Sequence, residues 1–171
     1  MTEMNNRFLA MVPEGGAVLD FGCGAGRDSK YFCSKGYKVT AVDGSMELAQ
    51  RASEFAGIHV RCEDFREFND LVSYDGIWAC ASLLHLKKSE IPGMLKKLAG
   101  AMHAGGVLYT SFKYGSFEGM RDGRYYTDLT PGELVRIAKK VPELTVKEVL
   151  TTKDVRTGKD TEWLNVFWRK S

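Results

Sequence analysis

The sequence predicts an α/β fold with a doubly wound, mostly parallel sheet of seven strands and an antiparallel C-terminal hairpin. Two observations carry this prediction. Short β-branched or apolar runs alternate with helical stretches up to residue 112, which is the pattern of right-handed βαβ units. Beyond that point the alternation stops, and the last two strand-like runs flank a charged turn around Gly158, as in a hairpin.

The first part of the chain supplies the strands and helices of the parallel units. β-branched and apolar runs predict the strands, and apolar residues at helical spacing predict the helices. Gly36 is suited to end the first of these helices, and Ser45 to cap the second, which has apolar positions at Met46 and Ala49. The strands are expected at residues 17–21, 37–42, 58–62, 75–80 and 107–112, and the helices at 27–35, from 46 onward, and at 91–102.

The remaining segments have a different character. Residues 113–128 are polar and rich in glycine, so we expect a loop there. Thr130 and Pro131 are suited to the N-cap and the first position of a helix that runs to about residue 140. Residues 4–11 can form at most a short helix. The hairpin strands are expected at residues 145–150 and 163–168.

Length and composition bound the class of protein. The 171 residues, 44% hydrophobic and 27% charged, fit one domain over residues 1–171 and exclude a disordered or collagen-like chain. The formal net charge of +2 lacks the basic surplus of a dedicated nucleic-acid binder. No apolar run approaches the ~20 residues that span a bilayer. We therefore expect a cytoplasmic protein with neither a nucleic-acid nor a membrane partner.

The cysteines support the same setting. Their dispersed positions lack C-x-x-C spacing, so neither a metal site nor a disulfide framework is expected. Reduced thiols of this kind are typical of cytosolic proteins. The four residues are Cys23, Cys33, Cys62 and Cys80.

A glycine-rich loop follows the first strand. In an open parallel sheet, ligands bind beyond the carboxyl ends of the strands, where the strand order reverses. A dinucleotide fingerprint that begins at Gly22 requires its third glycine at position 27, where the chain has Arg27. Asp20, two residues before the first glycine, would repel a pyrophosphate but suits an ammonium or sulfonium charge. A nucleotide-dependent oxidoreductase is therefore the less favoured alternative.

The segment Asp20-Phe21-Gly22-Cys23-Gly24-Ala25-Gly26 resembles the acidic-x-G-x-G-x-G motif of class I S-adenosylmethionine-dependent methyltransferases. The resemblance implies a Rossmann-like fold, with S-adenosyl-L-methionine as cofactor and S-adenosyl-L-homocysteine as product. The run Gly-Arg-Asp-Ser that begins at Gly26 is similar to small-molecule and tellurite-resistance-type members of the family. Further segments that are similar to family motifs, in the same order and spacing, are residues 42–45, 63–65, 75–85 and 105–108.

The resemblance also implies how the cofactor is held. Asp43 would accept hydrogen bonds from the ribose hydroxyls, Met46 would offer adenine an apolar face, and Asp64 would accept from the adenine amino group. Arg27 would pair either with the cofactor carboxylate or in a surface salt bridge. The expected cofactor-binding residues are Asp20, Gly22, Cys23, Gly24, Gly26, Arg27, Asp43, Gly44, Ser45, Met46, Asp64, Phe65, Cys80 and Ala81.

Several of these residues have a purely structural alternative. Gly24 or Gly26 could allow close packing of helix on strand, Asp43 could cap the next helix, and Asp64 could belong to a turn. Their joint placement at the ends of successive strands favours the binding roles.

The acceptor side offers one candidate base and one candidate loop. In-line methyl transfer requires aligned reactants, and it requires a base only if the acceptor loses a proton. His85 is the candidate catalytic base, with a packed structural histidine as the alternative. Cations and aromatic rings in the loop after residue 112 would bind a small anionic molecule, although a solvated loop is the alternative. The expected substrate-binding residues are Lys113, Arg121, Arg124, Tyr125 and Tyr126.

Two further features limit the functional prediction. Residues 79–82, Ala-Cys-Ala-Ser, replace the Asn/Asp-Pro-Pro-aromatic motif of methyltransferases that modify amino groups of nucleic acid or protein. Only 16 residues precede the first strand, fewer than in relatives, so the site is open, completed by a second copy in a homo-oligomer, or truncated. We therefore predict methyl transfer to a small, anionic molecule, with a cofactor-binding module that lacks transfer activity as the alternative.

Overall fold

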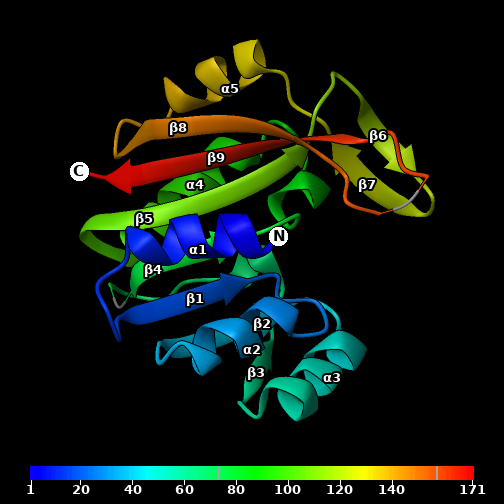
Figure 1. Cartoon of the computed structure of the whole chain (residues 1–171). Helices are drawn as coiled ribbons and strands as arrows, with labels where there is room; N and C mark the ends of the chain where they lie inside the picture. Colours follow the sequence, from blue (N-terminus) through cyan, green and yellow to red (C-terminus); the bar gives the residue numbers. More distant parts are fainter. Residues whose placement is uncertain (73, 157) are drawn as a thin grey trace.

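The computed structural model describes residues 1–72, 74–156 and 158–171, and it confirms the predicted fold class (Figure 1). Seven strands form one sheet in the order β3-β2-β1-β4-β5-β9-β8, and β6 and β7 form a separate two-stranded sheet. The strands are β1 (Ala17–Phe21), β2 (Lys38–Asp43), β3 (Val60–Cys62), β4 (Tyr74–Ala79), β5 (Met102–Lys113), β6 (Glu118–Arg121), β7 (Arg124–Thr127), β8 (Leu144–Lys153) and β9 (Glu162–Lys170). The helices are α1 (Thr2–Ala10), α2 (Arg27–Ser34), α3 (Met46–Ala56), α4 (Ile91–Gly100) and α5 (Pro131–Ala138), with 3₁₀ turns η1 (Phe65–Glu67) and η2 (Leu83–His85).

The strand order reverses beside β1. This strand pairs in parallel with β2 on one side and with β4 on the other, and Asp20 lies opposite Ala41 and Trp78. Strand β9 is antiparallel to both β5 and β8, which confirms the C-terminal hairpin. The loop after β1 therefore lies at the switch point where an open α/β sheet binds its ligands.

Helices cover both faces of the sheet. Phe8 of α1 and Phe32 of α2 pack with Val18 and Trp78 on one face. The other face packs against α4 and α5, and Figure 1 shows α1 in front of the sheet with α4 behind it. Alternate residues of β1 serve the two faces, since Val18 belongs to one core cluster and Leu19 to the other. The sheet is thus buried on both sides, which leaves its carboxyl edge for a site.

The predicted helix starts after Ser45 and Thr130 are confirmed. The Ser45 side chain accepts a hydrogen bond from the Leu48 backbone at 3.3 Å and caps α3. Thr130 forms a capping box with Glu133 at the start of α5. Such caps satisfy backbone N–H groups that have no partner within the helix.

Several expectations about boundaries were wrong, and the strand expected from residue 58 begins at Val60. The helix expected at 91–102 ends at Gly100, because Met102 already pairs with Tyr74 as the first residue of β5. The segment at 113–128 is not a loop throughout, since it contains the β6–β7 hairpin. Its turn consists of Asp122 and Gly123, both with positive φ, as a two-residue type I′ turn requires. At the N-terminus, α1 begins earlier than expected, at Thr2.

Candidate active site

The glycine loop has a left-handed backbone at all three glycines of the motif, with φ of 79° at Gly22, 55° at Gly24 and 87° at Gly26. A Cβ on Gly22 would lie 2.5 Å from the Ser82 Cβ, and one on Gly26 would lie 3.0 Å from Ala52, so both positions also serve close packing. A Cβ on Gly24 would meet no atom within 4 Å. The loop is therefore packed at its ends and open at its centre.

Asp43 ties this loop to the end of β2. Its Oδ2 accepts from the Gly24 N–H at 2.8 Å and its Oδ1 from the Ser45 N–H at 2.9 Å, and the residue is only 8% exposed. Ser45, not Asp43, is the N-cap of α3, so the capping alternative for Asp43 does not apply. Each carboxylate oxygen keeps a further lone pair for a ligand hydroxyl.

A pair of buried carboxylates lies under the loop. Asp20 accepts from the Ser29 hydroxyl at 2.6 Å, and burial followed by the nearby Asp28 charge raises its pKa to about 7. Asp28 accepts from the Trp78 indole N–H at 2.9 Å. Arg27 pairs with Asp28 at 3.2 Å with 67% of its side chain exposed, which is the salt-bridge alternative. Pairing of Arg27 with a cofactor carboxylate stays a prediction.

The expected adenine end is built from exposed groups. Met46, at the first position of α3, is 72% exposed. Asp64 is exposed and accepts from the Arg66 N–H at 2.7 Å, so its carboxylate caps η1. This is the role that the structural alternative, a turn residue, predicts. The Phe65 ring stacks on Phe21 with centroids 4.2 Å apart. The structure thus assigns Asp64 a local role, and contact with adenine stays a prediction.

The loop after β4 reaches the same edge. Ala81 has φ of 49°, a strained value for a residue with a side chain, and its N–H donates to the Ser111 hydroxyl at 2.8 Å. Burial raises the pKa of the Cys80 thiol to about 12, and burial also raises the pKa of Cys23. Both thiols are therefore protonated at neutral pH and are poor nucleophiles. Ser111 begins the segment expected to recognise the substrate, but its contact with Ala81 was not predicted, because folding decides which residues of separate segments meet.

The remaining cofactor candidate, Gly44, lies between Asp43 and Ser45. A Cβ there would be 3.9 Å from the Glu63 carbonyl oxygen, an ordinary contact, so packing does not demand glycine at this position.

His85 lies between the cofactor-binding candidates and the acceptor-binding candidates. Its Nδ1 is 2.9 Å from the Tyr125 carbonyl oxygen, and because a carbonyl only accepts, Nδ1 carries the proton and Nε2 has the free lone pair. Burial lowers the pKa of this half-buried ring. The Lys113 and Arg124 cations also lower this pKa, whereas the Asp43 carboxylate raises it. His85 is therefore neutral at neutral pH.

The expected acceptor residues divide into two groups. The Lys113 ammonium lies 4.5 Å from the centre of the Tyr126 ring, and that ring packs edge-on against His85. Arg121 donates to both oxygens of the buried Asp128, at 2.9 and 3.3 Å, so its guanidinium is engaged within the protein. The fold thus brings Lys113, Tyr126 and His85 together and uses Arg121 to hold the β6–β7 hairpin.

Tyr125 and Arg124 face outward in different ways. The Tyr125 hydroxyl donates to Glu118 at 2.9 Å across the hairpin, while the Tyr125 carbonyl accepts a hydrogen bond from the His85 Nδ1–H. Arg124 is exposed and forms no ion pair within the part of the chain that the structure describes. Its guanidinium is consequently available to a ligand.

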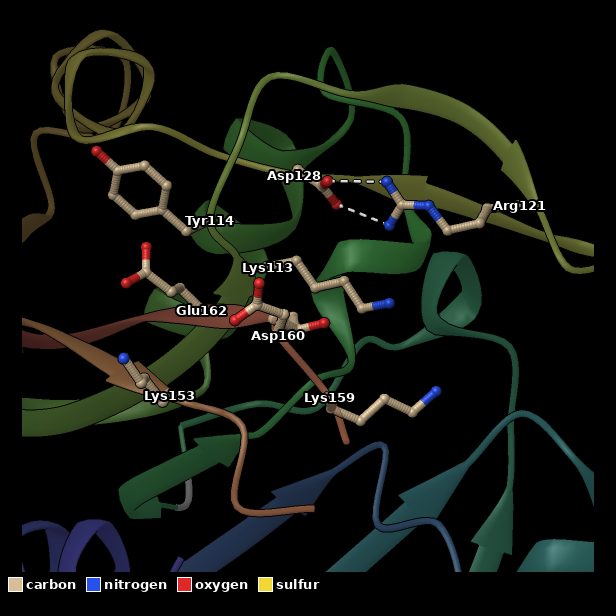
Figure 2. A pocket seen from close by; sticks show the side chains of 9 residues that line it. Lys113, Tyr114, Arg121, Asp128, Lys153, Lys159, Asp160 and Glu162 are labelled. Atoms are coloured by element: carbon tan, nitrogen blue, oxygen red, sulfur yellow. Dashed lines mark hydrogen bonds and ion pairs between the residues drawn. The ribbon is translucent and has the colours of Figure 1, made fainter. Parts of the chain in front are cut away.

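A cleft of about 570 Å³ opens beside Lys113 (Figure 2). Lys113 and Arg121 were expected at a site, but the residues from the β8–β9 turn were not, because nothing in their spacing distinguishes them from a solvated hairpin. The lining residues are Lys113, Tyr114, Arg121, Asp128, Lys153, Lys159, Asp160, Thr161 and Glu162.

Comparison with known proteins identifies the family. A family described as a methyltransferase domain matches residues 18–106, which include the loop after β1 and the ends of β2 and β4. The chain belongs to this family, which confirms the predicted resemblance.

Relatives at the sequence level are also methyltransferases. Pavine N-methyltransferase of Thalictrum flavum subsp. glaucum is 26% identical over 133 residues, covering 70% of this chain and 36% of its own. The S-adenosyl-L-methionine-dependent methyltransferase TehB of Haemophilus influenzae is 29% identical over 94 residues, covering 52% of this chain and 33% of its own. The chain thus spans about a third of the length of these curated relatives.

Solved structures share the fold. The 1,6-didemethyltoxoflavin-N1-methyltransferase of Burkholderia thailandensis, solved with S-adenosylhomocysteine, has a TM-score of 0.82 at 22% identity over 99% of this chain and 77% of its own. The [4+2]-cyclase SpnF has a TM-score of 0.77 at 15% identity over 98% of this chain and 80% of its own.

None of the helices within residues 1–72, 74–156 and 158–171 is both long and apolar enough to cross a bilayer.

Proposed function

We propose that this protein is an S-adenosylmethionine-dependent methyltransferase that acts on a small, anionic molecule. Family membership supports the reaction class, and the arrangement at the carboxyl edge of the sheet supports the cofactor. The cofactor would supply an electrophilic methyl group, and the protein would align the acceptor with it and exclude water.

The Asp43–Gly24 contact is the observation that carries the proposal. A carboxylate held by two backbone N–H groups cannot rotate, so its free lone pairs have a fixed direction suited to vicinal hydroxyls. The open centre of the glycine loop at Gly24 lets a ligand approach the backbone. The pKa of Asp20 is raised to about 7, and the ammonium of a methionine group nearby would favour its ionised form. These features fit S-adenosylmethionine better than a dinucleotide, because the Asp20 carboxylate directly precedes the loop and Arg27 stands where a dinucleotide fingerprint has its third glycine.

His85 is the proposed base for an acceptor that loses a proton. The Tyr125 carbonyl fixes the ring with Nε2 unprotonated, and the lowered pKa keeps it so at neutral pH. Lys113 and Arg124 would attract an anionic acceptor to the same side, and Tyr126 would cover it. Tyr125 would contribute mainly through its backbone, and Arg121 through the hairpin.

Calorimetric titration tests the cofactor. We expect S-adenosylmethionine and S-adenosylhomocysteine to bind with micromolar affinity, about −8 kcal/mol, and NAD to bind far more weakly. Binding of NAD without either adenosyl compound would overturn the proposal. Binding of the cofactor with no transfer in an acceptor screen that includes carboxylates and phosphates would favour the module without transfer activity.

A further inference from the structure

The cleft at Lys113 is built from segments that are distant in sequence. The end of β5 supplies Lys113 and Tyr114, and the β8–β9 turn supplies the opposite wall. The Tyr114 N–H donates to the Glu162 carbonyl at 2.9 Å, which joins the two walls. The fold therefore fixes the spacing between them.

The charges in this cleft are only partly neutralised from within. Arg121 and Asp128 form an internal pair, and Lys153 lies directly opposite Glu162 across the hairpin, where their charges partly offset each other. Two other cations, Lys113 and Lys159, form no ion pair with any residue that the structure describes. In Figure 2 their side chains extend toward the same side from the two different walls.

Of the two cations, Lys113 is the better suited to bind an anion. Its side chain is half-buried, and its ammonium rests over the Tyr126 ring at 4.5 Å without a carboxylate partner. Partial burial weakens the hydration of an ammonium, so an anionic ligand gains more there than at a fully exposed lysine.

Hydrogen bonds restrain the described residues around Lys159. Asp154 accepts from the Arg156 guanidinium at 2.9 Å and from the Trp163 indole at 3.3 Å. The Asp154 N–H donates to the Thr161 carbonyl, and the Lys159 N–H donates to the Arg156 carbonyl. The Lys159 backbone is thus tied to Arg156, which reduces the entropy cost of binding a ligand there.

We propose that Lys113 and Lys159 together bind an anionic group, a carboxylate or a phosphate, of the methyl acceptor. The assignment to the acceptor rests on the proposed function, while the anion site stands on the cleft itself. Ammonium groups donate without the planar fork of an arginine, so the site accepts either geometry. Four cations against three carboxylates leave the cleft one positive charge in excess, which suits a small anion and not a polyanion.

Titrations with sodium phosphate and with sodium acetate at constant ionic strength test the site, with backbone amide resonances as the readout. We expect saturable shifts around the cleft in the parent protein, with binding weakened at least about threefold in Lys113→Met and in Lys159→Met and lost in the double variant. Asp160→Asn should strengthen binding about twofold, because it removes a like charge. Saturation by acetate alone assigns a carboxylate, and saturation by phosphate alone assigns a phosphate.

Lys96→Met is the matched control, since Lys96 is an exposed lysine of α4 outside the cleft. Equal weakening in this control and in the double variant, or shifts that never saturate, would overturn the site. Calorimetry with S-adenosylhomocysteine separates the two proposals. A parent that binds phosphate but no S-adenosylhomocysteine overturns the proposed function and keeps the anion site, and the reverse result keeps the function alone.

Discussion

At the scale of single residues, Asp43 determines whether the loop is a cofactor site. In Asp43→Asn an amide NH₂ replaces one of two oxygens that face backbone donors, and it cannot accept from a ribose hydroxyl. We expect calorimetry to show at least about tenfold weaker binding of S-adenosylhomocysteine, about 1.4 kcal/mol. Asp75→Asn is the control, because Asp75 accepts from the Ala17 N–H at 2.8 Å at the first residue of β1, the end of the strand opposite the glycine loop. Equal affinities in both variants would remove the ribose role.

Asp20 predicts a dependence of stability on pH. Its pKa is about 7 in the folded protein against an ordinary value of 3.8, so the folded chain holds the proton more tightly. Between these values the unfolded chain has lost a proton that the folded chain keeps, and stability therefore falls as the pH rises through this window. Asp20→Asn removes this effect. The free energy of unfolding of the variant minus that of the parent should therefore rise by about 2 kcal/mol between pH 5 and pH 8.

Denaturant unfolding of the ligand-free protein at the two pH values measures the effect of Asp20→Asn. The Ser29 hydroxyl can still donate to the new amide oxygen, which limits other changes. The same variant should bind S-adenosylhomocysteine more weakly, since it can no longer become charged beside the ligand's ammonium, as the proposed function requires. A gain independent of pH would mean that Asp20 is not protonated in the folded state.

At the scale of elements, the β6–β7 hairpin depends on one bidentate ion pair. Arg121→Lys keeps the charge but loses the fork that contacts both Asp128 oxygens, and Asp128 is only 6% exposed. We expect a loss of about 1 kcal/mol in unfolding free energy, with cofactor affinity unchanged. If kcat/KM for an acceptor falls more than tenfold while stability is unaltered, Arg121 contacts the acceptor instead.

The same hairpin shows what sequence reasoning could and could not reach. The parallel strands and the caps at Ser45 and Thr130 were predictable, because period and capping chemistry are local properties. The Asp122-Gly123 turn was also a local signal, but the glycines around it led us to expect a loop in place of the short strands. The ion pair of Arg121 with Asp128 was out of reach, because the partner of a charge is decided by folding.

The candidate site likewise combines features that are local in sequence with contacts that only folding decides. The placement of Asp43 at a strand end follows from sequence, since strand ends in a parallel sheet share one edge. The wall that Lys159 contributes comes from a hairpin at the other end of the chain, and only the strand order β5-β9-β8 brings it beside Lys113. Family motifs therefore predict the cofactor side, whereas a prediction of the acceptor side requires the structure.

At the scale of the whole molecule, α1 is part of the core that supports the site. Phe8 is fully buried, with ring centroids 5.2 Å from Trp78 on β4 and 5.7 Å from Phe32 on α2. A Cβ on Gly76 would lie 2.7 Å from both Phe8 and Val12, so the helix lies directly on the strand. This contact joins the N-terminal helix to the strand whose end carries Cys80 and the loop to His85.

Phe8→Ala should therefore lower the unfolding free energy of the whole molecule by about 3–4 kcal/mol, because it removes a large buried ring between two elements. We expect a single transition, with coincident near-ultraviolet and far-ultraviolet dichroism, since the packing around Trp78 and the helices is lost together. Phe55→Ala is the matched control, because Phe55 is 52% exposed and should cost less than about 1 kcal/mol. Equal losses in the two variants would show that α1 does not share the core, and the site would then not depend on it.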